Sequence, residues 1–254
     1  MSAPNEPAAR AALDPAAVAD LLASLAHDLR SPLGVVAETL GELRTDFDSQ
    51  LTDEHRLLLS LAERSLRRLN RIADAMSLMV ALDSGSLELS RMPVFLADVL
   101  RAAVDSAVAI EPRREVELVR ELADAPFPLA ADADRLARAL SEVVINALRY
   151  ARRSVRQRLE QAGDGAARIV IEDDGEGVPA ARQATLFQRL MPRTSRAGLG
   201  IGLSLAHDVI VAHGGGITLE PSTLPPGRPG TVGARFVISL PCDTSSVRRP
   251  GVPG

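Results

Sequence analysis

His27 is the first residue whose type and setting suggest chemistry. The run LAHDLRSPL at 25–33 places Asp28 beside it and Ser31 about one helical turn further on. A carboxylate next to an imidazole can orient the ring and raise its basicity, which suits a histidine that acts as a nucleophile. Pro32 removes a backbone donor and should bend a helix at this point. Taken alone, an exposed histidine on a helix is more often an ordinary surface residue.

A second polar group lies in SEVVINALRY at 141–150, within a strongly periodic apolar pattern. Glu142, Asn146 and Arg149 are spaced i, i+4, i+7, so a helix would present a carboxylate, an amide and a guanidinium on one face. The oxygen atoms could hold magnesium, and arginine pairs well with phosphate. A polar face that is simply solvated is the alternative.

The run EDDGEGVP at 172–179 follows an apolar segment that is typical of a strand. An ionised carboxylate only accepts hydrogen bonds, so Asp173 can accept one from the exocyclic amine of adenine and would repel the carbonyl of guanine. Gly175 and Gly177 would let the backbone approach the base closely. An ordinary glycine turn is the alternative.

Three glycines alternate in GLGIGL at 198–203, immediately before a helical pattern. The amides of Gly198, Gly200 and Gly202 at a helix N-terminus would form a cradle for an anion, aided by the helix dipole. A Rossmann-type dinucleotide site is not indicated, because no strand immediately precedes the glycines.

The residues around His27 should lie on a helical hairpin. Over 15–83, Leu, Val, Ile and Met recur every three or four positions in two segments, joined by a turn around 47–51. On the first helix His27 faces away from the apolar stripe, toward water. Two helices with one stripe each cannot enclose a core, so we expect the hairpin to dimerise into a four-helix bundle.

The second half mixes helices and strands without regular βαβ repeats, which predicts an α+β fold in which an α/β sandwich follows the hairpin. We expect helices over 94–109, 132–151 and 203–212, and strands over 116–122, 168–172, 217–219 and 234–240. The expected divisions are a disordered segment 1–14, the hairpin 15–83, a linker 84–92, the sandwich domain 93–242 and a loose tail 243–254.

Composition argues against several classes of protein. A formal charge of −4 does not fit a broad nucleic-acid surface. A single cysteine, Cys242, excludes a disulfide framework and a cysteine metal cage, and fits a reducing cytoplasm. No apolar run approaches the roughly 20 residues of a membrane span, and the N-terminus lacks a signal-peptide pattern. We therefore expect a cytoplasmic chain with no membrane segment.

Taken together and in this order, the four motifs resemble those of the sensor histidine kinases of two-component systems. The run at 25–33 resembles the H-box that carries the phosphoacceptor histidine, and 141–150 resembles the N-box. The runs at 172–179 and 198–203 resemble the two glycine boxes. The resemblance covers about residues 15–240 and implies a HisKA-type hairpin followed by a Bergerat-type ATP-binding sandwich, as in gyrase and mismatch-repair ATPases.

The resemblance also implies a function. ATP would phosphorylate His27 with the help of Asp28, and the phosphoryl group would pass to an aspartate on the receiver domain of a response regulator. The implied partners are a second copy of the chain, forming a homodimer, and a sensor input that is separate or missing. The other implied roles are magnesium ligation by Asn146 and Glu142, a phosphate contact by Arg149 and packing of Tyr150 by the adenine.

Three departures from the family pattern affect these expectations. Ser31 stands where many members carry Thr or Asn, which places phosphatase activity in question. The interval from Phe187, which matches the F-box phenylalanine, to Gly198 is short, so the lid over ATP is expected to be truncated. No sensor domain is recognisable. His213, before two glycines, also matches a family pattern, but we expect it to be structural.

Two other classes of function remain open at this point. Glu142 and Asn146 reproduce the E-x-x-x-N of related conformational ATPases, in which the glutamate activates water, and turnover without His27 would favour that reading. A scaffold that binds partners through the bundle and transfers no phosphate is the other alternative. Failure to bind nucleotide would support it.

Overall fold

The computed structural model describes residues 15–122, 127–162, 166–188 and 200–242. The chain divides into two compact units, Met1–Leu87 and Glu88–Gly254, and each is described by itself. The expected disordered segment 1–14 and the expected tail 243–254 lie outside the described residues.

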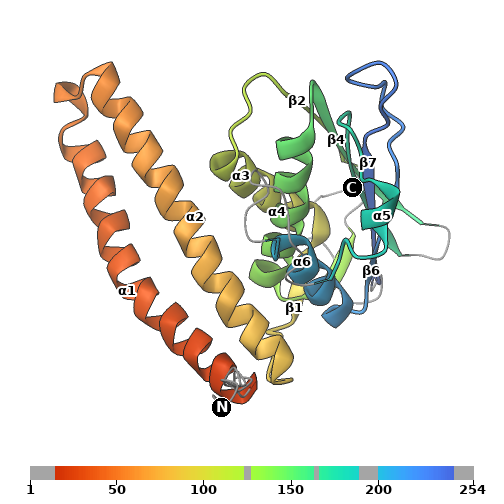
Figure 1. The fold of residues 1–254 in the computed structure, drawn as a ribbon, viewed down its shortest axis with the longest axis horizontal. Coiled ribbons are helices and arrows are strands. Elements are labelled where there is room, and N and C mark those ends of the chain that lie inside the picture. The colour runs from red at the N-terminus through yellow and green to blue at the C-terminus, as the bar shows by residue number, and fades with distance from the viewer. Residues whose placement is uncertain (1–14, 123–126, 163–165, 189–199, 243–254) are drawn as a thin grey trace, which may run out of the picture. The chain divides into compact units, whose positions relative to one another are not determined.

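The first unit is a helical hairpin (Figure 1). Helix α1 spans Pro15–Asp46, a short 3-10 helix η1 spans Asp48–Gln50, and α2 spans Asp53–Asp83. Thr52 caps the start of α2, because its hydroxyl accepts a hydrogen bond from the His55 backbone N–H at 3.2 Å. The His55 ring accepts one from the Thr52 N–H in return. This reciprocal capping box fixes where the second helix begins.

The hairpin buries little of its apolar surface. The buried apolar side chains on its described helices are Ala26, Leu66, Ala73 and Met79. Many large apolar side chains stay exposed on both helices: Leu21, Leu25, Leu29, Val35, Val36, Leu43, Leu57, Leu58, Leu61 and Leu69. Two helices can cover only one side of each other, so the rest of the wide apolar stripe is left in water in a single chain.

The second unit is built on a five-stranded sheet with the order β2-β4-β5-β7-β6. Strands β2 and β4 are parallel, and the other neighbours are antiparallel. A separate antiparallel pair joins β1 to β3. The strands are β1 Met92–Phe95, β2 Glu117–Leu122, β3 Pro128–Ala131, β4 Ser154–Gln161, β5 Ala167–Asp173, β6 Gly216–Pro221 and β7 Ala234–Leu240.

Three helices, α3 Leu96–Ile110, α4 Ala133–Tyr150 and α6 Gly202–Ala212, cover one face of the sheet, with α4 between the other two (Figure 1). A fourth, α5, is a single turn over Ala180–Gln183. The burial pattern of β7 shows that one face of the sheet points inward. Phe236, Ile238 and Leu240 are fully buried, whereas Ser239 is exposed. Alternate residues of a strand point to opposite faces, so this pattern puts the apolar set against the helices.

Several strands differ from the sequence prediction. The segment 94–109 was expected to be wholly helical, but Val94 and Phe95 belong to β1 and the helix begins at Leu96. Strand β3 is short and starts with a proline, so its pattern gives little signal. Strand β4 was not predicted, because Gln157 occupies an inward position between Val155 and Leu159 and interrupts the apolar alternation.

The predicted fold class, a helical hairpin followed by an α/β sandwich, is confirmed. Among the helices of the described residues, none combines the length and the apolar character needed to cross a membrane.

Candidate functional site

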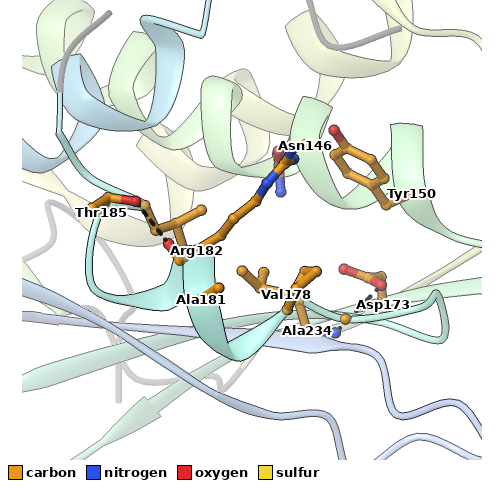
Figure 2. Close-up of a pocket in the computed structure, with 11 residues that line it drawn as sticks. Asn146, Tyr150, Asp173, Val178, Ala181, Arg182, Thr185 and Ala234 are labelled. Atoms are coloured by element: carbon orange, nitrogen blue, oxygen red, sulfur yellow. Dashed lines mark hydrogen bonds between the residues drawn. The ribbon is translucent and has the colours of Figure 1, made fainter. Parts of the chain in front are cut away.

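The second unit holds a pocket beside the C-terminal half of α4 (Figure 2). Its volume is about 210 Å³, and its wall is mainly apolar. The side opposite α4 is the segment that leads from the end of β5 into α5, and the start of β7 closes the base. The lining residues are Asn146, Tyr150, Asp173, Gly177, Val178, Pro179, Ala181, Arg182, Thr185, Leu186 and Ala234.

Asp173 supplies a buried carboxylate with one unused oxygen to this pocket. Its side chain is 1% exposed. Oδ1 accepts hydrogen bonds from the backbone N–H of Gly175 at 2.9 Å and, more weakly, of Ala234 at 3.5 Å. Oδ2 is buried and has no partner among the described residues. A buried acceptor left without a donor is costly, so this oxygen is suited to accept a hydrogen bond from a ligand.

Burial raises the pKa of Asp173 from 3.8 to about 6. The N–H groups of Gly175 and Ala234 oppose the rise, and the nearby carboxylates of Asp174 and Glu172 add to it. At neutral pH the group is still ionised and is a pure acceptor.

The two neighbouring carboxylates are already engaged by the protein. Asp174 accepts hydrogen bonds from the backbone N–H groups of Arg152, Arg153 and Ser154 at 2.8 to 3.2 Å. Burial would raise the pKa of Asp174, but these N–H groups bring the net pKa below its usual value. Asp174 therefore fixes the turn between α4 and β4.

Glu172 points to the other side of the sheet and ties β5 to the loop after β6. It accepts hydrogen bonds from the Thr223 N–H at 2.9 Å and from the Thr223 and Ser222 hydroxyls. Arg156 on β4 lies 3.6 Å from one of its oxygens. Of the three consecutive acids, only Asp173 lines the pocket.

The glycines at 175 and 177 are required by the protein itself. A Cβ on Gly175 would lie 2.4 Å from the backbone oxygen of Tyr150, and one on Gly177 would lie 2.2 Å from that of Val232. Gly177 also has φ +70°, a conformation that L side chains rarely adopt. The sequence predicted a close approach of this backbone to a base, and the structure shows a close approach to the end of α4 and to the loop residues just before β7.

The predicted N-box residues of α4 do not all line the pocket. Asn146 and Tyr150 line the pocket. Arg149 instead forms an ion pair with Glu111 at the end of α3, with a nitrogen–oxygen distance of 3.2 Å. The phosphate contact of Arg149 stays a prediction. Its guanidinium already has a carboxylate partner, Glu111.

Glu142 lies against the start of α6. A Cβ added to Gly202 would lie 2.2 Å from Oε2 of Glu142, so the carboxylate packs on the glycine backbone. Gly200 is buried and has φ +69°. Two predicted motifs thus meet at the N-terminus of α6, where backbone N–H groups are left unpaired by the helix. Gly198 and the expected short lid lie outside the described residues.

Arg113 caps the C-terminal end of α4. Its guanidinium donates hydrogen bonds to the carbonyls of Leu148, Arg149 and Ala151 at 3.1 to 3.3 Å. The last carbonyls of a helix have no intrahelical donor, and a cation there also suits the helix dipole. Arg113 thereby holds the turn that carries Tyr150.

His213 has the structural role that the sequence predicted. It is 1% exposed and ends α6. Nδ1 lies 2.8 Å from the Val209 carbonyl, and Nε2 accepts a hydrogen bond from the Asp132 N–H at 3.1 Å. Both ring nitrogens are thus paired, and the end of α6 is joined to the start of α4.

On the hairpin, the predicted phosphoacceptor His27 is exposed, as are Asp28 and Ser31. Arg30 in the same run reaches across to α2, where it pairs with Asp74 at 3.3 Å and donates a hydrogen bond to the Ser77 hydroxyl at 2.6 Å. These contacts fix the rotation of α1 against α2, and they leave the imidazole on the solvent side.

Sequence reasoning missed the wall formed by 178–186. Apart from Val178 and Pro179, which end the run at 172–179, its residues are mostly small or apolar and match no chemical motif, so only the polar Arg182, Gln183 and Thr185 could have drawn notice. Phe187 follows this wall and stacks on His207 of α6, with ring centroids 5.5 Å apart. This contact joins the end of the wall to the helix at the second glycine box.

Two family models match the chain. Residues 17–85 match the His Kinase A (phospho-acceptor) domain, and residues 131–244 match the histidine kinase-, DNA gyrase B- and HSP90-like ATPase. Together they cover more than half of the chain. The chain is also similar to named kinases over most of its length. The sensor-type histidine kinase PrrB of Mycobacterium tuberculosis is 30% identical over 230 residues, which are 89% of this chain and 48% of PrrB.

The alginate biosynthesis sensor protein KinB of Pseudomonas aeruginosa is 27% identical over 85% of this chain and 35% of KinB. The chain thus spans about a third to a half of the length of these relatives. Among solved structures, full-length ShkA in complex with AMPPNP has a TM-score of 0.62 at 24% identity, covering 90% of this chain and 47% of ShkA. The mycobacterial sensor histidine kinase MprB has a TM-score of 0.51 at 26% identity, covering 59% and 98%.

Proposed function

Since the chain belongs to the histidine kinase family, we propose that it transfers the γ-phosphoryl group of ATP to His27 and then to an aspartate of a response regulator. The observation that carries this proposal is the combination of an exposed imidazole on α1 with a second unit whose pocket presents one unpaired, buried carboxylate oxygen. The first group can accept a phosphoryl group, and the second can recognise the nucleotide.

Asp173 recognises the adenine in this proposal. Its Oδ2 would accept a hydrogen bond from the exocyclic amine, while Oδ1 keeps its bond to the Gly175 N–H. Guanine presents a carbonyl at the same place, and two acceptors repel each other. Tyr150 lines the same pocket and supplies an aromatic surface to the base.

The phosphates would lie toward Asn146 and the N-terminus of α6. The N–H groups around Gly200 and Gly202 favour negative charge there. Asn146 and Glu142 offer two oxygen ligands one helical turn apart, which suits Mg²⁺, a cation that is usually held by one or two protein groups together with substrate phosphates. When bound, Mg²⁺ supplies positive charge that offsets the charge of the phosphates.

His27 would act as the nucleophile. A lone pair of a neutral ring nitrogen forms the N–P bond as the bond between the γ-phosphorus and the bridging oxygen breaks, and ADP carries away that oxygen. Asp28 orients the imidazole and stabilises its positive charge. Phosphoryl transfer depends chiefly on positioning and electrostatics, so the helix that holds His27 at the surface and the pocket that holds the nucleotide would together supply what the step needs.

The proposed partners follow from the same surfaces. A second copy of the chain would cover the apolar side chains that the hairpin leaves exposed, forming a four-helix bundle. A receiver domain would approach His27 from the solvent side and take the phosphoryl group. We place this reaction in the cytoplasm, with the input supplied by a separate or missing sensor region.

The test is the variant His27→Gln, with His55→Gln as its control. His55 is also an exposed histidine of the hairpin, and glutamine at that position of a capping box preserves the cap. With γ-labelled ATP, the His27 variant should acquire no acid-labile, base-stable phosphate, whereas the control should be labelled like the wild type. Labelling of the His27 variant would refute the proposal, and unchanged ATP turnover without labelling would favour a conformational ATPase.

A further inference from the structure

Arg182 is a cation over the pocket to which the sequence assigned no role. It belongs to the single turn α5 and lines the pocket from the side opposite α4. Figure 2 shows its side chain extended across the cavity, with the guanidinium pointing toward Asn146 and away from Asp173. Its backbone carbonyl accepts a hydrogen bond from the Thr185 hydroxyl, which helps to hold the turn.

Among the residues that the structure describes, no carboxylate pairs with the guanidinium of Arg182. The two arginines at the end of α4 and just after it have carboxylate partners, since Arg149 pairs with Glu111 and Arg152 pairs with Glu176. Within the described ranges, the guanidinium of Arg182 makes no ion pair and no hydrogen bond to a side chain. The arginine that the sequence predicted for the phosphates is therefore engaged elsewhere, whereas Arg182 faces the cavity with its donors unused.

This position fits a phosphate contact. If Asp173 holds the base, the ribose and phosphates must extend away from it, toward the side where Asn146 and the guanidinium of Arg182 point. Arginine presents a planar fork of N–H donors that matches a phosphate with two parallel hydrogen bonds. We propose that Arg182 is a phosphate-binding residue of the nucleotide site, contributed by the wall that faces α4. The inference rests on the proposed function, because it takes ATP as the ligand.

The test compares the full chain with Arg182→Gln by calorimetry, using Mg–ATP, Mg–ADP and adenosine as separate ligands. Glutamine keeps a polar side chain but removes the charge and the fork. Loss of a charged hydrogen bond should weaken ATP and ADP binding about tenfold or more and leave adenosine binding unchanged. Arg182→Lys keeps the charge without the fork and should recover part of the affinity. Arg168→Gln, at a residue paired with Glu160 on another part of the sheet, controls for net charge.

The outcomes separate the inference from the function on which it rests. Equal losses for ATP and adenosine would show that Arg182 only shapes the pocket, and unchanged ATP affinity would show that it does not touch the phosphates. Either result overturns the inference while the wild type still binds ATP. A wild type that bound neither ATP nor adenosine would overturn the proposed function, and the inference with it.

Discussion

Replacing Asp173 with asparagine should weaken ATP binding without weakening the fold. The aspartate has two acceptor oxygens, one bonded to the Gly175 N–H and one open to the pocket. An amide has only one acceptor, so either the Gly175 N–H or the adenine amine must face an NH₂ group. A charge-assisted hydrogen bond contributes about 1.5–3 kcal/mol, so the Kd for ATP should rise at least about tenfold.

The effect on stability should have the opposite sign. The pKa of Asp173 rises from 3.8 to about 6, which at about 1.4 kcal/mol per pH unit means that ionising this buried carboxylate costs the fold roughly 3 kcal/mol. Asparagine removes that cost but leaves one buried N–H group without an acceptor, at about 1–3 kcal/mol. At pH 7.5 the nucleotide-free variant should therefore be as stable as the wild type, or up to about 2 kcal/mol more stable.

The pH dependence follows from the raised pKa. Between pH 3.8 and about 6 the folded state binds more protons at Asp173 than the unfolded state does. Wild-type stability from this group is thus greatest below pH 3.8 and falls as pH rises to about 6. As the pH is lowered toward 4, protonation of Asp173 gives the wild type back up to roughly 3 kcal/mol, so the advantage of the variant should vanish and the wild type should become the more stable of the two. Adenosine, which carries no titrating phosphate, should bind the wild type less well below pH 6, where Asp173 becomes protonated.

Calorimetry for ATP and urea unfolding without nucleotide measure the two effects, and Asp174→Asn is the matched control. That carboxylate accepts three backbone hydrogen bonds, so its loss should lower the free energy of unfolding by about 2–3 kcal/mol. If Asp173→Asn destabilised the fold as much as Asp174→Asn, Asp173 would be a structural residue. If ATP affinity were unchanged, the adenine contact would have to lie elsewhere.

Three further changes test other parts of the molecule. Arg113→Met leaves the last carbonyls of α4 without their donor and should lower the free energy of unfolding by about 2 kcal/mol, seen in urea unfolding; an unchanged midpoint would mean that water replaces the cap. Gly202→Ala forces the Glu142 carboxylate aside, so autophosphorylation should drop at least about tenfold while the melting temperature changes by only a few degrees. Ser31→Thr should speed decay of the phosphorylated regulator with kinase and ADP present, because the β-branched side chain holds its hydroxyl in fewer rotamers, and should keep autophosphorylation within about threefold. Rapid decay with the wild type, and no gain with Thr, would show that Ser31 already positions the water.

The helical parts of the fold were easier to predict than the sheet. The periodic apolar residues of α1, α2 and α4 signal long helices directly, since burial on one face repeats every three or four positions. Strand β4 gave no such signal, because Gln157 points inward where an apolar residue is expected. Strands β1 and β3 each have four residues and contain a proline, which leaves too short a pattern to detect.

The candidate site divides in a similar way. Asp173, Asn146 and Tyr150 were named from their motifs, and they line one pocket. Arg149 was named too, but the motif cannot show that Glu111, 38 positions away in sequence, occupies its guanidinium. Arg182 was missed because it belongs to no motif. It lies over the cavity only because α5 turns back across the pocket, which the sequence pattern does not show.

The three consecutive acids at the end of β5 have a consequence for enzyme engineering. Glu172 ties down a loop, Asp173 faces the pocket and Asp174 fixes a turn, each through different neighbours. If Asp173 binds the base as proposed, base preference and folding are encoded by separate side chains although the residues are adjacent. On that proposal, a redesign for a modified purine would begin at position 173 and keep 172 and 174 unchanged, because those two side chains hold the surrounding loop and turn.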